Sequence, residues 1–216
     1  MNKAFIRPAT ASDLPYLYRI CLLTGYKGTD ASDYYSDPFL LGQYYVAPYF
    51  FYEPECCFVL ETTQEHTVAG YIAGTSDTRG FIQWRNRSWL LQLARRCNAA
   101  NEGQLSGPET ELRKLIVNCV SPDAEDKNIR RTIEQSRTEQ EYPAHFHIDI
   151  LPDLQHLGFG HELVLSFTEN LRLLHIHGVH LGVDKGNLPA RAFYKKEGFS
   201  DVLEEKEYLL LGKKIS

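Results

Sequence analysis

The chain of 216 residues carries a formal net charge of -5 at pH 7, with 43% hydrophobic and 24% charged residues. This composition is ordinary for a globular protein and excludes a disordered or fibrous chain, and the length suits one domain better than two. The negative charge argues against general binding to nucleic acid or to anionic membranes, so we expect no nucleic-acid partner and no membrane partner. A cationic or neutral substrate fits this charge better.

The N-terminal quarter predicts a strand, a helix and an aromatic segment. Ala4–Arg7 has the pattern of a short strand, and Ser12 or Asp13 caps a helix whose apolar residues recur at helical spacing. Pro15 lies in the first turn of this helix, where a missing amide is tolerated. Residues 26–52 are rich in tyrosine and phenylalanine, which either line a pocket or pack a helix and a loop onto a sheet.

A hairpin and a long insertion follow. Cys57–Thr62 and Val68–Thr75 are apolar or β-branched runs around a polar turn, which predicts two antiparallel strands. The insertion, 76–142, is far longer than typical connections in a compact domain, and its apolar spacing predicts two helices. Residues 79–96 hold five arginines and no acid, which fits a solvated helix side or a contact for an acidic partner or phosphates. Residues 124–141 fit a solvated helix or a mobile lid.

Residues 145–161 join an apolar strand to a helix through a loop with two glycines. Alternation places Phe146, Ile148 and Ile150 on one side of the strand and His145, His147 and Asp149 on the other. Pro152 ends the strand because it cannot donate to a sheet ladder. A helix begins near Gly158, and its unpaired amides, together with the positive end of its dipole, form a site for an anion such as phosphate.

The C-terminal part predicts the rest of the sheet. The helix after Gly158 has an apolar face that runs as far as Leu174, and Gly178 is expected to break it. Val179–Val183 forms a fifth strand, which lies parallel to the strand before the glycine loop. Residues 207–212 supply a closing strand.

Two of these segments together resemble the GNAT superfamily of N-acyltransferases. Gln155, Gly158 and Gly160 fill its acyl-CoA-binding signature Q/R-x-x-G-x-G/A. Residues 187–199 resemble the family's common ending, an Asn, an Ala-rich helix with a tyrosine, and Gly-Phe. The resemblance covers 1–74 and 143–212. It implies an α+β fold over residues 1–216 as a single domain, with a mixed, mostly antiparallel central sheet, helices on both faces and a helical insertion at about 76–142, between the third and fourth strands.

The resemblance also implies acetyl-CoA as the acyl donor. The fourth and fifth strands would splay apart so that the pantetheine arm lies along Ile150 and Leu151, with the pyrophosphate on the amides of the following loop. The residues that it assigns to the cofactor are Ile150, Leu151, Gln155, His156, Leu157, Gly158, Phe159, Gly160, His161, Asn187 and Tyr194.

Acyl transfer to an amine requires removal of a proton from the ammonium, stabilisation of the oxyanion and protonation of the leaving thiolate. Tyr194 matches the family's tyrosine and is the candidate acid, although it also fits a helix-packing role. Asp149 is the preferred base because an aspartate in the middle of a strand is costly unless it is paired or used. Asp184 is the reserve, and His147 is expected mainly to hydrogen-bond Asp149.

Other functions fit less well. The glycine loop lacks the third glycine and the position of a dinucleotide-binding turn, and no P-loop motif is present. His175, His177 and His180 lack the spacing and the acidic or cysteine partners of a zinc site, so we expect no metal. A non-catalytic acyl-CoA-binding or partner-binding module is the alternative to an enzyme. The amine acceptor, small molecule or protein, stays open, as does a homodimer formed through the insertion.

The five cysteines are an odd number, two are adjacent and none forms a C-x-x-C pair, which indicates reduced thiols. The N-terminus lacks the apolar segment of a secretory signal, and no run approaches the roughly 18 apolar residues of a membrane span. We therefore expect a cytoplasmic protein.

Overall fold

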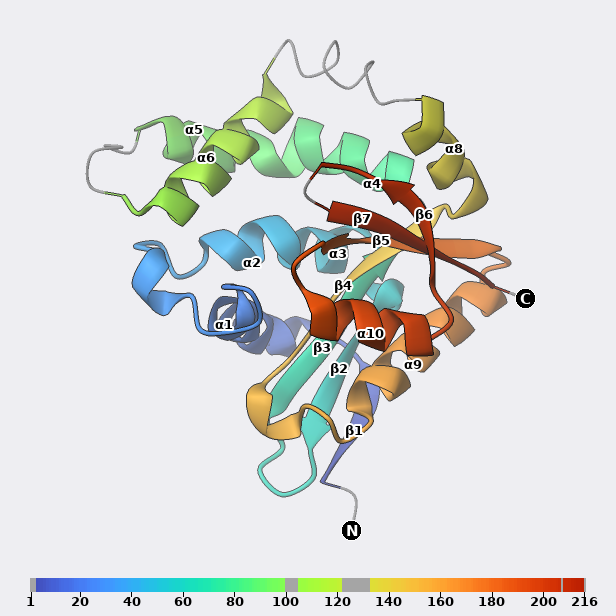
Figure 1. The fold of residues 1–216 in the computed structure, drawn as a ribbon. Coiled ribbons are helices and arrows are strands. Elements are labelled where there is room, and N and C mark those ends of the chain that lie inside the picture. The colour runs from blue at the N-terminus through green and yellow to red at the C-terminus, as the bar shows by residue number, and fades with distance from the viewer. Residues whose placement is uncertain (1–2, 100–104, 122–132, 207, 216) are drawn as a thin grey trace.

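The computed structural model describes residues 3–99, 105–121, 133–206 and 208–215. In this part of the chain the strands form one seven-stranded sheet in the order β1-β2-β3-β4-β5-β7-β6 (Figure 1). Its strands are β1 (Ala4–Pro8), β2 (Cys57–Thr62), β3 (Val68–Thr75), β4 (Ala144–Ile150), β5 (Gly178–Asp184), β6 (Ser200–Glu204) and β7 (Tyr208–Lys214). The β4–β5 pair is parallel and the other neighbouring pairs are antiparallel, which confirms the predicted mixed sheet.

Helices cover both faces of this sheet. They are α1 (Leu14–Thr24), α2 (Leu40–Tyr45), α3 (Ala47–Tyr52), α4 (Thr78–Trp84), α5 (Leu90–Ala99), α6 (Gly107–Val120), α8 (Ile133–Glu141), α9 (Phe159–Leu173) and α10 (Leu188–Lys196). A π-helical turn at Arg85–Trp89 links α4 to α5, and short 3₁₀ turns occur at Ala11–Asp13, Ser32–Tyr34, Pro54–Cys56 and Pro152–Leu154. Helices α4, α5, α6 and α8 lie between β3 and β4 in the chain, as the predicted helical insertion requires.

Two expectations for the C-terminal part need correction, and one strand was not predicted. Gly178 does not break the preceding helix, because α9 ends at Leu173 and Gly178 is the first residue of β5. The closing strand, expected at 207–212, is described over Tyr208–Lys214 and so continues beyond 212; residue 207 lies outside the described part of the chain. The sequence also gave no sign of β6, whose Ser-Asp-Val-Leu-Glu sequence lacks a clean apolar alternation, so that its pairing with β7 depends on a tertiary contact.

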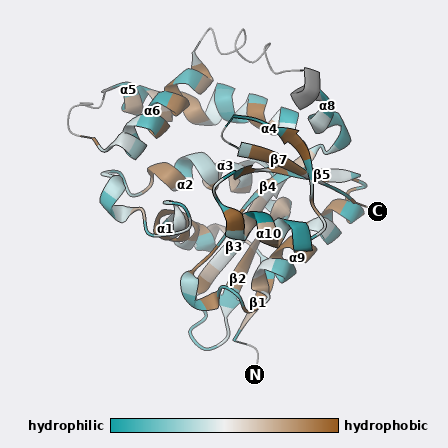
Figure 2. Ribbon diagram, viewed as in Figure 1, coloured by the Kyte–Doolittle hydropathy of each residue, from teal (hydrophilic) through white to brown (hydrophobic). Residues whose placement is uncertain are grey.

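The sheet separates two hydrophobic cores, because alternate residues of each strand point to opposite faces. Tyr71 of β3 belongs to the core under α1, α2 and α3, whereas its neighbour Ile72 belongs to the core under α9. Figure 2 shows hydrophobic residues along the central strands and hydrophilic ones on the outer turns of α9 and α10. The aromatic segment 26–52 contributes Tyr44 and Tyr49 to the first core, so packing is their main role.

The insertion shares this first core. Its buried residues Phe81, Leu90, Leu93, Leu112 and Ile116 cluster with those of α1 and β3. Two side chains of the arginine-rich stretch contact α2 and the loop before it. The Arg85 guanidinium lies 4.9 Å from the Tyr44 ring centre, and Arg96 pairs with Asp37 at 3.2 Å. Of the predicted solvated helix or lid at 124–141, residues 124–132 lie outside the described part of the chain, and the remainder forms α8.

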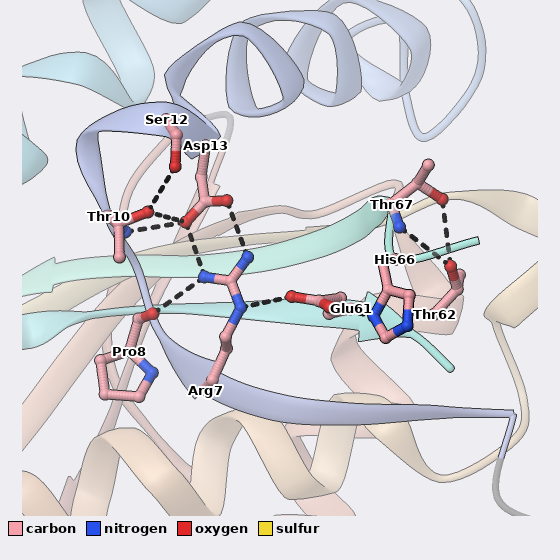
Figure 3. A network of polar contacts seen from close by, with 9 residues as sticks. All are labelled: Arg7, Pro8, Thr10, Ser12, Asp13, Glu61, Thr62, His66 and Thr67. Carbon is pink, nitrogen blue, oxygen red and sulfur yellow. Dashed lines mark hydrogen bonds and ion pairs between the residues drawn. The ribbon is translucent and has the colours of Figure 1, made fainter. Parts of the chain in front are cut away.

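A polar network fixes the start of α1 against the sheet (Figure 3). Asp13 stands at the N-cap position of α1, but its side chain makes no capping bond to the helix and bonds Arg7 and the Thr10 amide instead; Pro15 lies in the first turn. Arg7 donates to both Asp13 carboxylate oxygens at 2.7 and 2.8 Å and to Glu61 of β2 at 2.5 Å. His66 also contacts Glu61, at 2.9 Å. This network connects β1, β2 and α1 at the edge of the sheet.

Candidate functional site

The parallel pair β4–β5 separates soon after it begins. The two strands are paired only at Ala144 with Val179 and at His145 with His180. Beyond that point β4 remains paired with β3 as far as Ile150, and β5 remains paired with β7 as far as Asp184. The facing edges of 146–150 and 181–184 therefore share no ladder bonds, and their backbone groups are left for another partner.

A loop with left-handed backbone conformations lies at the end of this opening. Gly158, the N-cap of α9, has φ +93°, and His156 has φ 60°. A Cβ atom at Gly158 would meet nothing within 4 Å, whereas one at Gly160 would lie 3.2 Å from the Phe193 ring. Gly158 is therefore required by the backbone conformation, and Gly160 by close packing against α10.

The beginning of α9 presents backbone donors to this loop. The first bond of the helix runs from the Glu162 amide to the Gly158 carbonyl, at 3.2 Å. The amides of Phe159, Gly160 and His161 precede it and have no acceptor within the helix. Three amides at the positive end of a helix dipole form a binding site for an anion.

Two predicted cofactor residues close the loop against the sheet. The Gln155 side-chain amide donates to the Ile150 carbonyl at 2.7 Å, and the Leu151 amide donates to the Ala69 carbonyl of β3 at 2.8 Å. Because a carbonyl oxygen can accept two hydrogen bonds, Ile150 retains one acceptor position toward the opening. The Leu151 amide is already committed to the sheet.

Residues of α10 lie near the same opening. Asn187 caps α10, its side-chain oxygen accepting a hydrogen bond from the Ala190 amide at 3.1 Å, which leaves its NH₂ group for a ligand. Tyr194 is half-buried among the rings of Phe146, Phe193 and Phe199. Burial and then the charge of Asp149 raise the pKa of the Tyr194 phenol above its ordinary value, so it stays protonated but is a weaker acid than a free phenol.

Asp149 forms a polar cluster with a tyrosine and a histidine on the other face of β4. The Tyr71 hydroxyl donates to Asp149 Oδ2 at 2.7 Å and lies 3.1 Å from His147 Nδ1, which is itself 3.5 Å from Asp149 Oδ2. Burial raises the pKa of Asp149, although the His147 charge and the Tyr71 hydrogen bond oppose this rise. The Asp149 side chain is nevertheless 20% exposed, so it lines an accessible surface.

The other polar residues of this region have structural partners. His145 bonds to the Thr78 hydroxyl through Nδ1 and to the Tyr49 hydroxyl through Nε2, both at 2.7 Å. Asp184, the reserve base, accepts a hydrogen bond from the Gly186 amide at 2.7 Å in the turn after β5. Neither residue joins the Asp149 cluster through these bonds.

Sequence reasoning missed Tyr71. This residue is fully buried in an entirely buried strand, so its local pattern is that of a core tyrosine. The register of β3 on β4, in which Tyr71 faces Asp149, brings its hydroxyl to the carboxylate. That register depends on residues far apart in the chain, which explains why no local signal identified it.

Two of the histidines that were considered and rejected as zinc ligands have other contacts. His177 Nε2 lies 3.1 Å from the Gln140 carbonyl oxygen and His180 Nδ1 lies 2.6 Å from that of Tyr142. Within residues 3–99, 105–121, 133–206 and 208–215, no group of three or more His, Cys, Asp or Glu side chains is arranged to hold a metal ion. No helix among those described has the length and hydrophobicity to cross a bilayer.

Comparison with known proteins gives consistent matches. Residues 124–199 match the model of the Acetyltransferase (GNAT) family. The crystal structure of a protein named SsHAT is similar over 100% of both chains, with 29% identity and a TM-score of 0.81.

Two further crystal structures are similar in fold. A Chaetomium thermophilum protein in complex with a bisubstrate analogue has 19% identity and a TM-score of 0.54, over 98% of this chain and 86% of that one. The Salmonella typhimurium protein yncA, with its cofactor acetyl-CoA, has 12% identity and a TM-score of 0.52, over 100% of this chain and 95% of that one.

Proposed function

We propose that this chain, a GNAT acetyltransferase by its family match and its fold, transfers an acetyl group from acetyl-CoA to a primary amine of an acceptor. The observation that carries the proposal is the opening between β4 and β5, which ends at the left-handed glycine loop and the N-terminus of α9. This arrangement offers backbone partners for an extended amide-containing arm next to donors for a diphosphate.

The cofactor would use the residues assigned by the sequence. Its pyrophosphate would lie on the amides from His156 to His161, and its pantetheine arm along Ile150, which keeps an acceptor position. The Leu151 amide is bonded to β3, so Leu151 would contribute through its side chain or carbonyl. Gln155 would hold the loop in place, and the Asn187 NH₂ group and Tyr194 would lie toward the thioester.

The chemistry would divide between the two sides of the opening. The Asp149 cluster takes one proton from the acceptor's ammonium, and the freed amine attacks the thioester carbonyl. As the carbon–sulfur bond breaks, Tyr194 donates its proton to the thiolate and regains one from the attacking nitrogen as the amide forms. A phenol ordinarily titrates near about 10 and a thiol near about 8.5, and burial raises the pKa of Tyr194 further, so positioning rather than driving force must supply this effect.

The acceptor and the assembly belong to the same proposal. A carboxylate at the site and a net charge of -5 favour a cationic amine, small molecule or protein.

We treat 1–216 as one domain because the insertion shares the core of α1 and β3. A homodimer is tested by the mass of the full chain in gel filtration, since deletion of 79–140 would remove core residues. Cytoplasmic location is supported by five cysteines that are all free thiols.

Calorimetry with acetyl-CoA and coenzyme A, followed by thiol release with a panel of amines, tests the function. We expect binding of both thiol compounds and turnover with at least one amine. The absence of any heat at about millimolar concentration would contradict the proposal. Tight binding without turnover on any amine would favour the non-catalytic module instead.

A further inference from the structure

The Asp149 cluster contains two groups able to accept the acceptor's proton, and their geometry distinguishes them. Asp149 Oδ2 already accepts a hydrogen bond from Tyr71 at 2.7 Å. The His147 side chain is more exposed, at 31% against 20% for Asp149. The imidazole is therefore the more accessible of the two bases, although Asp149 carries the stronger expectation from sequence.

The hydroxyl of Tyr71 sets the protonation of His147. A hydroxyl has a single proton, and Tyr71 donates it to Asp149, so its oxygen can only accept from His147 Nδ1 at 3.1 Å. Nδ1 of a neutral His147 must then carry the hydrogen, which leaves a lone pair on Nε2. Burial and the Asp149 charge raise the pKa of Tyr71, so Tyr71 remains a donor in this chain of bonds.

The ring of His147 has aromatic and acidic neighbours. Its ring stacks on Tyr71 at 5.9 Å between centres and lies 5.4 Å from the ring of Tyr45. Aromatic faces attract a cation, and the carboxylate 3.5 Å from Nδ1 supplies a negative charge. The groups around the imidazole that would carry the added proton are thus two rings and the Asp149 carboxylate.

We propose that Nε2 of His147 takes the proton from the acceptor's ammonium, with Tyr71 and Asp149 as positioning residues that fix the tautomer and balance the charge. This inference rests on the proposed function and changes the atom that receives the proton. The nitrogen–hydrogen bond of the ammonium breaks, a bond to Nε2 forms, and the electron pair stays on the amine nitrogen, which attacks the thioester. The imidazolium then releases its proton to water.

The first test is spectroscopic and does not require activity. In the full chain labelled with ¹⁵N-histidine, we expect the His147 signals, assigned with His147→Gln, to show a protonated Nδ1 and an unprotonated Nε2. Tyr71→Phe should remove this preference. Tyr49→Phe is the matched control, because it also removes a hydrogen bond between a buried tyrosine and a histidine, here His145. A protonated Nε2 in the neutral wild-type ring would overturn the inference.

The second test is kinetic. His147→Ala should lower kcat by about 10²- to 10⁴-fold with unchanged acetyl-CoA affinity, and added imidazole should restore part of the turnover. Tyr71→Phe should lower kcat about 10-fold or more, whereas Tyr49→Phe should not, at a similar cost in stability. Wild-type turnover in His147→Gln would refute the role of His147 and leave the acetyltransferase function intact, whereas a wild-type chain inactive on every amine would refute that function first.

Discussion

Asp13 and Asp149 are both held inside the fold, yet their surroundings shift their pKa values in opposite directions. Burial alone would raise the pKa of each. At Asp13 the hydrogen bonds from Arg7 and Thr10 outweigh burial and lower the pKa, and Figure 3 shows the guanidinium that does so. At Asp149 the partners are His147, Tyr71 and Thr24, none of which carries a guanidinium, and the pKa remains raised.

Glu109 of the insertion resembles Asp13 in having a lowered pKa. It accepts hydrogen bonds from the Ser36 amide and hydroxyl and from Arg113, and these lower its pKa against the effect of burial. The difference teaches that Asp13 and Glu109, each paired with a guanidinium, join elements of the fold, whereas Asp149, whose contacts are with hydroxyl groups and a histidine, lies beside the opening. Strongly shifted groups in accessible positions are candidates for chemistry.

The largest effect is expected at Tyr194, whose pKa is raised in part by the charge of Asp149. Tyr194→Phe should lower kcat by about 10²- to 10⁴-fold, because the thiolate loses its proton donor, with little change in acetyl-CoA affinity. Steady-state kinetics and calorimetry on the same preparation measure both quantities. Unchanged turnover would remove Tyr194 from the mechanism and leave it a packing residue.

Asp149→Asn should separate function from stability. We expect kcat to fall by about 10²-fold or more. The thermal midpoint at neutral pH should hold or rise, because a buried charge without a guanidinium partner is removed. Assays and thermal unfolding measure the two effects, and a large loss of stability with normal turnover would reverse the assignment.

Asp13→Asn is the matched counterpart. It breaks the ion pair between Arg7 and Asp13. Because the Asp13 side chain is only 4% exposed, we expect a loss of about 3 kcal/mol in the free energy of unfolding. The kcat of the folded protein should not change. Denaturant titration supplies the free energy, and a fall in kcat comparable to that of Asp149→Asn would show that the two sites are coupled.

A smaller effect is expected at the glycine loop. Gly158→Val should weaken acetyl-CoA binding about 10-fold or more, through both the strained φ and a side chain in the path of the diphosphate. Gly28→Val is the control, because Gly28 has φ +88° and equally open surroundings. Pantetheine, which lacks the diphosphate, should bind both variants alike by calorimetry, and equal affinities of the two variants for acetyl-CoA would exclude the loop as its site.

The smallest effect concerns acid stability. The lowered pKa values of Asp13 and Glu109 give stability that is present above their unfolded values, about 4, and lost as pH falls through the folded ones. The pKa of Asp149 is raised rather than lowered, so protonation of Asp149 stabilises the fold as pH falls from neutral. Asp149→Asn should abolish that rise, and Asp13→Asn should flatten the loss at low pH, in unfolding curves measured from pH 3 to 7.

The sequence alone determined the local parts of this site. Period-two alternation placed His147 and Asp149 on one face of β4, and glycine spacing located the loop that caps α9. The mixed sheet and the helical insertion also followed from the family resemblance. These features are readable because each depends on a few neighbouring residues.

Only the tertiary structure decided which distant side chains meet. The register of β3 on β4 brought Tyr71 to Asp149, and the pairing of β1 with β2 brought Arg7 to Glu61. Sequence patterns likewise did not predict the strand β6 or the burial of the insertion in the first core. Such contacts join residues separated by long stretches of sequence, so their free energy depends on the assembled fold and leaves no periodic trace in the residues themselves.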